Sequence, residues 1–333
     1  MNDLLLNVCE LSTVIPTDDG LVHPVREVSF SLYRGKTLGV VGESGCGKSM
    51  TGLSLLQLIP RPGYIQSGTI EYYDGTSQTP IRIDRLKADQ DEMREIRGNK
   101  IAMIFQEPMS SLNPVYTIGE QIGEAVRIHQ RTAKKEAREI AIGMLERVGI
   151  PGPQQRVDEY PHQLSGGMRQ RAMIAMALCC RPELLIADEP TTALDVTIQA
   201  QILDLLKDLQ SEMNMAIMMI THDLGVIADL ADEIMVMYAG QIVETGSPEH
   251  IFYEYQHPYS QGLLASIPQM GSTRTAALPS ISGTVPSTLH LPDGCSFLPR
   301  CKYATDQCTE APAMSEVEPS HFVRCWHRDE LVR

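Results

Sequence analysis

The sequence predicts an α/β fold with an inserted helical subdomain and a small, loop-rich C-terminal extension. Strand-like and helical segments alternate over the first 255 residues, and a glycine-rich turn separates one such strand from one such helix. Proline, glycine, serine and threonine become frequent from residue 256 onward. Because such alternation is typical of a sheet covered by helices, we expect one α/β domain over residues 1–255 and an extension over residues 256–333.

The individual elements are expected from the spacing of apolar residues and from the turns between them. A helical subdomain is expected over about residues 107–170, within which residues 132–148 are rich in alanine, lysine, arginine and glutamate. A further helix is expected to begin near Ser165 and to end near Cys180. The other strands are expected at residues 4–8, 28–32, 37–41, 101–105, 183–188 and 216–220, and the other helices at residues 48–58 and 196–213.

The composition is that of an acidic globular protein. The chain has 28 basic and 42 acidic residues, and the resulting net charge of −14 disfavours nonspecific binding to nucleic acid. The longest apolar runs, at residues 172–180 and 215–220, are shorter than the ~20 residues that a membrane-spanning helix needs. No basic segment followed by an apolar stretch stands at the N-terminus, so we expect a cytosolic protein.

The glycine-rich turn at residues 42–49, Gly-Glu-Ser-Gly-Cys-Gly-Lys-Ser, has the spacing of a phosphate-binding loop. Its glycines allow backbone N–H groups to face phosphates, and the following helix adds the positive end of its dipole. Lys48 is expected to reach the β- and γ-phosphates, and the Ser49 hydroxyl to bind Mg²⁺. A tight turn with an incidental lysine is the alternative, but the flanking strand and helix are both present. The expected phosphate-binding residues are Gly42, Ser44, Gly45, Cys46, Gly47, Lys48 and Ser49.

Two acidic residues, Asp188 and Glu189, follow the apolar stretch at residues 184–187. An aspartate at the end of a buried parallel strand can hold Mg²⁺ through water, opposite the loop. The adjacent glutamate can then polarise an attacking water as a general base. A solvated helix cap is the commoner explanation for such a pair alone, and the catalytic interpretation depends on the other motifs.

Residues 164–168, Leu-Ser-Gly-Gly-Met, stand at the start of an expected helix. Ser165 suits the N-cap, and Gly166 and Gly167 leave backbone N–H groups open to an anion. A flexible turn before a helix is the alternative for these residues alone. Because they lie about 20 residues before Glu189, the chain here resembles the ABC (ATP-binding cassette) ATPases, whose signature reads LSGGQ. Met168 replaces the final glutamine of that signature.

Further elements of this family appear in the family's order. Gln106 matches the Q-loop glutamine, which senses Mg²⁺ and contacts the membrane subunits. Residues 193–195, Ala-Leu-Asp, match the D-loop with Asp195, and His222 matches the switch histidine that holds the γ-phosphate and the attacking water. Taken alone, Gln106 is a surface-loop residue and His222 a strand-end histidine bonded locally.

The resemblance implies an ATPase that uses ATP and Mg²⁺. It makes Glu189 the general base and His222 the second catalytic residue, with Mg²⁺ held by Ser49, Gln106 and Asp188. Family members usually stack an aromatic residue on adenine upstream of the loop, but residues 11–15 contain none. Val14 or Ile15 is the expected replacement.

The resemblance also implies partners. In this family two cassettes pair head to tail, so each ATP lies between the loop of one cassette and the signature of the other. A second cassette, identical or homologous, is therefore expected, together with two transmembrane permease subunits and a periplasmic or extracytoplasmic substrate-binding protein. The chain is expected at the cytoplasmic face of the inner membrane, as a peripheral subunit. The residues expected to contact the partner's nucleotide are Ser165, Gly166, Gly167 and Met168.

Within the family, the signature variant and the C-terminal extension are similar to the ATPases of bacterial dipeptide and oligopeptide importers, and nickel-complex import is the alternative. The nearest resemblance is to the dipeptide-importer ATPase that bears a four-cysteine C-terminal segment. Non-transport ABC proteins of DNA repair or of the ribosome are an alternative from another class. They carry a long coiled coil or a second cassette, for which this chain has no room. A metal-binding regulatory protein, with ATP secondary, is the third interpretation.

Four cysteines lie near the C-terminus with the spacing Cys295-x5-Cys301-x6-Cys308-x16-Cys325. In a cytosolic protein such a group suits a metal better than disulfides, and four thiolates suit either Zn²⁺ or an iron–sulfur cluster. The absence of C-x2-C pairs weakens the case for zinc. Free thiols or oxidation-labile pairs are the remaining alternative.

Three segments are similar to the C-terminal extension of peptide-importer ATPases: residues 257–259 (His-Pro-Tyr), 278–286 and 299–301 (Pro-Arg-Cys). In some of those proteins the four cysteines hold a [4Fe-4S] cluster, and the resemblance implies the same here. A structural role for the four-cysteine site is the simpler hypothesis, and a redox or regulatory role is the more specific one. The segment is far in sequence from the ATP motifs, so no part in hydrolysis is assigned to it. His290, His321 and His327 are alternative ligands but are expected to be ordinary loop residues.

Overall fold

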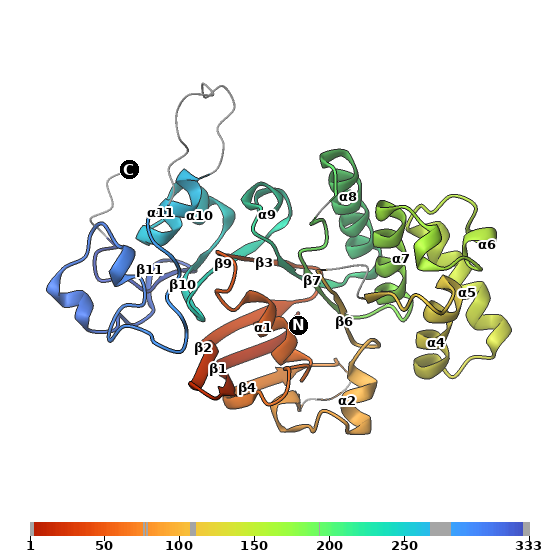
Figure 1. Cartoon of the computed structure of the whole chain (residues 1–333), viewed down its shortest axis with the longest axis horizontal. Coiled ribbons are helices and arrows are strands. Elements are labelled where there is room, and N and C mark those ends of the chain that lie inside the picture. The colour runs from red at the N-terminus through yellow and green to blue at the C-terminus, as the bar shows by residue number, and fades with distance from the viewer. Residues whose placement is uncertain are drawn as a thin grey trace. The chain divides into compact units, whose positions relative to one another are not determined.

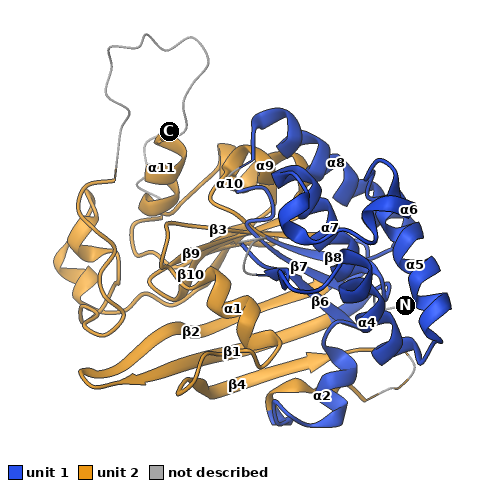
Figure 2. Cartoon of the chain, turned by 45° about the vertical axis from the view of Figure 1, so that its right-hand side comes forward, with its two compact units in different colours: residues 1–5, 33–36, 85–219 blue, residues 6–32, 37–84, 220–333 orange. Residues whose placement is uncertain are grey.

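The computed structural model describes residues 3–75, 77, 79–106, 111–192, 194–266 and 281–328. The chain divides into two compact units, shown in blue and orange in Figure 2. Unit 1 comprises residues 1–5, 33–36 and 85–219, and unit 2 comprises residues 6–32, 37–84 and 220–333. No helix in the described ranges is both long enough and apolar enough to cross a membrane.

Unit 1 contains neighbouring buried strands in the order β8–β7–β6. These are β6 (Ile101–Ile104), β7 (Leu184–Asp188) and most of β8 (Ala216–Ile220). β6 runs parallel to β7, and every residue of β7 and β8 is buried. Continuous apolar runs of this kind are typical of parallel strands that are covered on both faces. The helices of unit 1 are α2 (Asp91–Ile96), α4 (Ile118–Gln130), α5 (Lys134–Arg147), α6 (Pro153–Arg156), η2 (Pro161–Gln163), α7 (Gly166–Leu178) and α8 (Val196–Met213).

Helices α4 to α7 lie together in unit 1 (Figure 1). α4 begins with a capping box, in which the Thr117 hydroxyl accepts from the N–H of Glu120 and the Glu120 carboxylate accepts from the N–H of Thr117. Ile118, Ile122 and Val126 are buried at a spacing of four residues, and α4 packs against α5 and α7. Residues 107–110, at the start of the predicted helical subdomain, lie outside the described residues. Its predicted boundaries stay predictions.

Unit 2 contains two sheets. The first has the order β2–β1–β4–β5, formed by β1 (Leu4–Thr17), β2 (Gly20–Tyr33), β4 (Tyr64–Tyr72) and β5 (Ile81–Arg82). The second joins β11 (Ser315–Glu318), β12 (His321–Val323), β10 (Gln241–Gly246), β9 (Glu233–Tyr238) and β3 (Thr37–Val41), in that order. β3 runs parallel to β9, and β9 runs antiparallel to β10. The helices are α1 (Lys48–Leu55), η1 (Ile83–Arg85), α9 (Leu224–Leu230), α10 (Pro248–Tyr253), α11 (Pro258–Ala265), η3 (Leu298–Arg300) and η4 (Asp306–Thr309).

The C-terminal extension is tied into the second sheet of unit 2. β12 pairs with β10, and Val323 lies opposite Glu244. The Glu244 carboxylate is fully buried and accepts from the backbone N–H groups of Gln256 and His257 at 2.6 and 3.2 Å. Residues beside the predicted boundary near 255 are thus bonded directly to the sheet, while the boundary itself stays a prediction.

One prediction for the extension is wrong. His321 was expected to be an ordinary loop residue, but it begins β12 and its side chain is fully buried. Its Nε2 lies 2.9 Å from Oε1 of Glu244. A buried carboxylate needs polar partners, and the imidazole of His321 is one of the partners of Glu244. The sequence did not reveal this contact, because the two residues are far apart in the chain.

Candidate functional site

The predicted phosphate-binding loop joins β3 to α1 in unit 2. Gly42 and Gly47 adopt φ values of +148° and +105°, a region that side chains rarely enter. A Cβ atom at Gly42 would collide with the carbonyl oxygen of Met237, and one at Gly47 with the carbonyl oxygen of Pro24. Glycine is therefore required at both positions by conformation and by space.

Lys48 lies at the first turn of α1, with its side chain turned back over the loop. Only 5% of this residue is exposed. Its Nζ donates to the carbonyl oxygens of Gly42 at 2.7 Å and Glu43 at 3.0 Å. An ammonium group beside a glycine-rich loop and a helix N-terminus is an arrangement that binds phosphate.

Ser44, Gly45, Cys46 and Ser49 complete the predicted loop residues. Gly45 has φ +81° with nothing near the position of a Cβ atom, so it is required by conformation alone. Cys46 is fully buried, and burial raises the pKa of its thiol. A buried, protonated thiol is a packing residue rather than a nucleophile.

In unit 1, two predicted site residues meet directly. Gln106 follows β6, and its Nε2 donates to Oε2 of Glu189 at 3.0 Å. Asp188, the last residue of β7, is 5% exposed. Glu189 has φ +48°, which is uncommon for a residue with a side chain and costs conformational energy.

Thr192 is a site residue that the sequence analysis missed. Its hydroxyl donates to Oε2 of Glu189 at 2.8 Å, three residues away in the chain. A hydroxyl-bearing residue in the turn after Asp188-Glu189 was visible in the sequence. Because many turns contain serine or threonine, it did not single out Thr192. Ala193 of the predicted D-loop lies outside the described residues.

The predicted signature residues form the start of α7. Ser165 is its N-cap, and the Ser165 hydroxyl accepts from the N–H of Met168 at 3.3 Å. A Cβ atom at Gly166 would meet nothing within 4 Å, whereas one at Gly167 would lie 3.2 Å from Ile198. The prediction of Ser165 as N-cap is confirmed, and the backbone at Gly166 faces open space.

Asp195 and His222 precede the helices α8 and α9. Asp195 caps α8 by accepting from the N–H of Ile198 at 3.0 Å. His222 is exposed and stands between β8 and α9. Asp223 beside it caps α9. Unit 1 therefore carries the predicted residues Gln106, Ser165, Gly166, Gly167, Met168, Asp188, Glu189 and Asp195, and unit 2 carries the loop and His222.

The stretch at residues 11–15, expected to meet adenine, lies in β1. Val14 is fully buried, so it offers no surface to a base. Ile15 is partly exposed.

Comparison with known proteins assigns the chain to a family. The family model "ABC transporter" matches residues 25–192, and the model "Oligopeptide/dipeptide transporter, C-terminal region" matches residues 243–308. A putative peptide import ATP-binding protein of Brucella melitensis is 49% identical over 335 residues, which cover 98% of each chain. The chain belongs to the ABC transporter family.

Two further similarities support this assignment. The dipeptide transport ATP-binding protein of Escherichia coli is 48% identical to this ABC transporter chain, and the match covers 96% of each protein. The dimeric structure of the ATP-binding cassette MJ0796, in a post-hydrolysis state bound to ADP and phosphate, has a TM-score of 0.62. It is 27% identical and covers 73% of this chain and 99% of that one. The predicted ABC-type α/β fold and ATPase class are confirmed.

The four C-terminal cysteines of the ABC transporter chain lie in one small region of unit 2. Cys295 precedes η3, Cys301 follows it, Cys308 lies in η4 and Cys325 follows β12. None of the four forms a disulfide. The N–H of Cys295 donates to the carbonyl oxygen of Cys308 at 3.0 Å, which holds these two residues together.

Burial governs the chemistry of these thiols. It raises the pKa of Cys295 and Cys301, and that of Cys325 to about 12. For Cys325, negative charge on the other cysteines of the group is a smaller cause of the same rise in pKa. Thiols whose ionisation is disfavoured by burial and by neighbouring negative charge, as at Cys295, Cys301 and Cys325, are suited to a shared cation that stabilises the thiolates.

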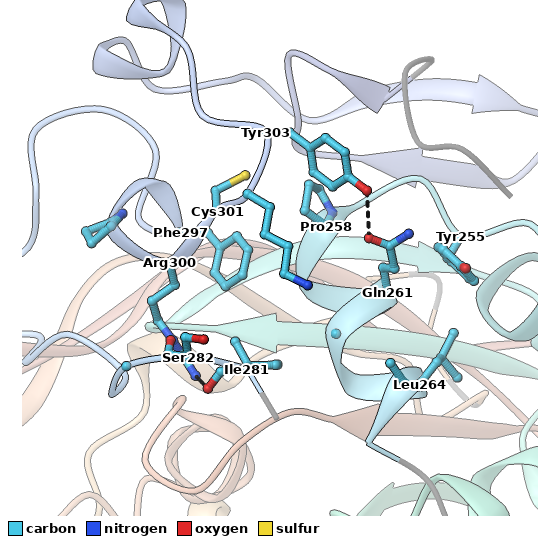
Figure 3. Close-up of a pocket in the computed structure, with 15 residues that line it drawn as sticks. Tyr255, Pro258, Gln261, Leu264, Ile281, Ser282, Phe297, Arg300, Cys301 and Tyr303 are labelled. Atoms are coloured by element: carbon cyan, nitrogen blue, oxygen red, sulfur yellow. Dashed lines mark hydrogen bonds between the residues drawn. The ribbon is translucent and has the colours of Figure 1, made fainter. Parts of the chain in front are cut away.

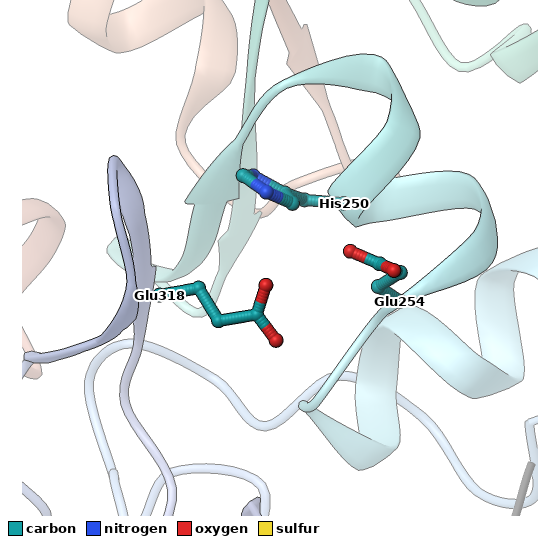
Figure 4. Close-up of side chains that lie close together, drawn as sticks. All are labelled: His250, Glu254 and Glu318. Carbon is teal, nitrogen blue, oxygen red and sulfur yellow. The ribbon is translucent and has the colours of Figure 1, made fainter.

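A different cluster of possible ligands lies on α10, on the residue that follows it and on β11 (Figure 4). His250, Glu254 and Glu318 offer atoms that all lie within 4.8 Å of one another. In the described ranges it is the one group of three or more such side chains that meets this limit. Glu318 is exposed, and exposed acidic side chains gather on surfaces without an ion, so the cluster alone does not define a metal centre.

A cavity of about 740 Å³ lies beside α11 and η3 (Figure 3). Cys301 and Arg300 line it together with Phe297, Ile281 and Tyr303. Sequence analysis singled out Arg300 only as part of the segment Pro-Arg-Cys. In the structure its guanidinium pairs with Glu43 of the phosphate-binding loop, with N–O distances of 2.7 and 2.9 Å.

Proposed function

We propose that the chain is the ATP-hydrolysing subunit of a membrane importer of dipeptides or oligopeptides. The observation that carries this proposal is the match of residues 243–308 to the C-terminal region of oligopeptide/dipeptide transporters, beside the ABC transporter match. The relatives named above, one a putative peptide import protein and one a dipeptide transport protein, are similar to the chain over nearly its whole length. Similarity in the extension matters, because the cassette alone serves transporters of many cargoes.

ATP is held by the loop at residues 42–49. Its backbone N–H groups and the N-terminus of α1 bind the phosphates, and Lys48 reaches the β- and γ-phosphates. Ser49, Gln106 and Asp188 offer a hydroxyl, an amide and a carboxylate, a donor set that fits Mg²⁺ because this ion prefers oxygen ligands. Bound with ATP, Mg²⁺ neutralises phosphate charge.

Glu189 acts as the general base and takes a proton from the attacking water. Gln106 and Thr192 both donate to its Oε2, so the carboxylate keeps one orientation while the water approaches. His222 contacts the γ-phosphate and stabilises the charge that develops there. The exposure of His222 supports this role, because a buried imidazole would not reach a nucleotide.

A second cassette completes each ATP site. The dimeric structure of the MJ0796 cassette supports the pairing of two cassettes. The open backbone at Gly166 and the N-terminus of α7 suit the phosphates of a nucleotide held by the partner. Asp195 of the D-loop belongs to the same contact region. The signature residues in this role are Ser165, Gly166, Gly167 and Met168.

Two permease subunits receive the movement of the cassettes, and an extracytoplasmic protein delivers the peptide. Exposed apolar side chains close to Gln106 in the sequence support a permease contact: Val115 is 71% exposed, Tyr116 52% and Phe105 39%. Large apolar side chains left exposed are a feature of protein interaction surfaces. The chain then lies at the cytoplasmic face of the inner membrane, as a peripheral subunit.

We further infer that Cys295, Cys301, Cys308 and Cys325 hold a [4Fe-4S] cluster. Four thiolates bound to one Zn²⁺ at about 2.3 Å lie about 3.8 Å apart by tetrahedral geometry. No three of these sulfur atoms lie within 4.8 Å of one another, which is wider than the spacing around a single Zn²⁺. A cubane cluster takes one cysteine at each iron. It would supply a covalent link between η3, η4 and the end of β12.

Uptake by cells that lack the chain tests the transport proposal. Labelled dipeptides, oligopeptides and nickel are offered to cells restored with the wild-type chain or with Glu189→Gln, which removes the base. Peptide uptake that returns with the wild type alone supports the proposal. Restoration of nickel uptake without peptide uptake would assign the alternative cargo, and equal restoration by Glu189→Gln would remove the catalytic assignment.

A further inference from the structure

Glu43, the second residue of the phosphate-binding loop, is held from the C-terminal extension at two points. Its backbone N–H donates to the hydroxyl oxygen of Tyr259 at 2.8 Å. Its carboxylate oxygens Oε2 and Oε1 accept from Nη1 and Nη2 of Arg300 at 2.7 and 2.9 Å. These partners lie 216 and 257 residues away in the sequence. All three residues belong to unit 2.

Burial and hydrogen bonds hold the Arg300 side chain in one conformation. Only 3% of it is exposed. Nε donates to the carbonyl oxygen of Ser282 at 2.9 Å, Nη2 also donates to that of Ile281 at 3.2 Å, and Nη1 also to the Tyr238 hydroxyl at 3.4 Å. Figure 3 shows the guanidinium against Ser282 and Ile281. Every N–H of its planar fork has an acceptor, so the carboxylate of Glu43 meets a preorganised bidentate partner.

Tyr259 is fixed equally well. It follows Pro258 at the start of α11, where His257 is the N-cap and accepts from the N–H of Tyr259. The ring is fully buried and lies 4.6 Å from the Tyr238 ring and 5.5 Å from the Phe297 ring, between centroids. Burial raises the pKa of its phenol, so the hydroxyl stays protonated. The segment His-Pro-Tyr at residues 257–259 thus delivers one acceptor to the loop.

Glu43 connects these contacts to the phosphate-binding lysine. Its carbonyl oxygen accepts from Nζ of Lys48 at 3.0 Å, so a shift of Glu43 changes the surroundings of the ammonium group. Its carboxylate is also a negative charge within a loop that must receive phosphates. Arg300 neutralises that charge, and an unpaired carboxylate at this place would repel the nucleotide.

We propose that Arg300 and Tyr259 are positioning residues for ATP, which fix Glu43 and thereby set the nucleotide affinity of the phosphate-binding loop. The proposal rests on the proposed function in one respect: the loop must bind ATP. It goes further in assigning part of that affinity to the C-terminal extension. Neither residue needs to touch the nucleotide, since both act through Glu43.

Binding of a fluorescent N-methylanthraniloyl ATP to the full chain, with Mg²⁺, tests the proposal. Arg300→Gln is compared with Lys302→Gln, which removes an exposed positive charge two residues away. Tyr259→Phe is compared with Tyr303→Phe, which removes a hydroxyl bonded to Gln261 instead of the loop. We expect Arg300→Gln to weaken nucleotide binding about tenfold, which lies within the usual range of coupling between sites. We expect Tyr259→Phe, which removes one hydrogen bond, to weaken it about threefold, slightly below that range. The two control variants should bind as the wild type does.

A charge-rescue variant separates positioning from simple loss of structure. Arg300→Gln leaves an unpaired carboxylate in the loop, whereas the double variant Arg300→Gln with Glu43→Gln removes it. The double variant should therefore bind nucleotide more tightly than Arg300→Gln alone. Arg300→Lys keeps the positive charge but cannot form two parallel hydrogen bonds to the carboxylate. Its nucleotide affinity should lie between that of Arg300→Gln and that of the wild type. In the assembled transporter, the change should appear in KM for ATP more than in kcat.

The outcomes separate this inference from the proposed function. A wild-type chain that does not bind the ATP analogue would remove the ATP assignment itself. A wild type that binds, with Arg300→Gln and Tyr259→Phe indistinguishable from their controls, would overturn the positioning role alone. If Arg300→Gln does not fold, the comparison of Tyr259→Phe with Tyr303→Phe decides, and equal affinities overturn the proposal. If the double variant binds nucleotide no more tightly than Arg300→Gln alone, the claim that Arg300 acts by neutralising the Glu43 carboxylate is overturned.

Discussion

Gln106 and Glu189 are joined by a hydrogen bond of 3.0 Å from Nε2 to Oε2. The same oxygen accepts from the Thr192 hydroxyl at 2.8 Å. Glu189 holds this position with a left-handed backbone at φ +48°. A carboxylate fixed by two donors on a strained backbone is typical of groups whose orientation matters for chemistry.

Removing the Thr192 hydroxyl should impair hydrolysis without affecting ATP binding. Thr192→Val keeps the shape of the side chain and frees one side of the Glu189 carboxylate, so the base loses part of its orientation. We expect kcat to fall by about 10- to 100-fold, because small misplacements of a reacting group have effects of this size, with KM for ATP unchanged. Thr192→Ser is the matched control, since it retains the hydroxyl. Equal turnover by the Val and Ser variants would show that the hydrogen bond has no catalytic role.

Several elements could be predicted to the residue because local signals bound them on both sides. The predicted ranges 37–41, 196–213 and 216–220 are β3, α8 and β8. The predicted helix at 48–58 ends at Leu55 instead, because Gln57 takes a left-handed conformation at φ +55°. The predicted strands at 4–8 and 28–32 are parts of longer strands, β1 and β2, whose polar residues hid their full length.

Contacts between distant segments could not be predicted. The ATP motifs were visible because each is a short pattern of glycines, acids or hydroxyls. Nothing local marks Arg300 as the partner of Glu43, which lies 257 residues away, and the sequence distance led us to assign the extension no part in hydrolysis. His321 was misjudged for the same reason, since its buried partner Glu244 is 77 residues away.

His257 should make the chain sensitive to acid. Burial lowers the pKa of His257 to about 3, from 6.5. As pH falls below 6.5, the unfolded chain binds a proton that the folded chain refuses, so the free energy of unfolding falls with pH. Between pH 7 and pH 5 this contributes a loss of about 2 kcal/mol. His257→Asn keeps a capping oxygen for α11 without titrating, and should remove that part of the loss.

Urea denaturation at the two pH values measures this difference. His290→Asn changes an exposed histidine and serves as the control, which should retain the wild-type dependence. A His257→Asn chain that loses as much stability as the wild type between pH 7 and pH 5 would contradict the prediction.

Two glycines of unit 1 should respond oppositely to alanine, although a Cβ atom at either would meet nothing within 4 Å. Gly143 lies inside α5, where alanine removes flexibility from the unfolded chain, and Gly143→Ala should raise the free energy of unfolding by about 0.5–1 kcal/mol. Gly152 has φ +64°, so Gly152→Ala should lower it by about 1–2 kcal/mol. Urea denaturation of both variants measures the two effects. Changes of the same sign would show that space, and not backbone conformation, governs these positions.

The four-cysteine site predicts a metal content that can be measured directly. Anaerobically purified chain should contain about four iron atoms and absorb in the visible region, as a [4Fe-4S] protein does. Cys308→Ser removes the one ligand of the four that is buried and should abolish both signals. Cys9→Ser, at an exposed cysteine of β1, should leave both unchanged. About one zinc atom per chain, lost in Cys308→Ser, would replace the iron assignment with zinc. Wild-type chain free of both metals would show that the four thiols pack without a shared ion.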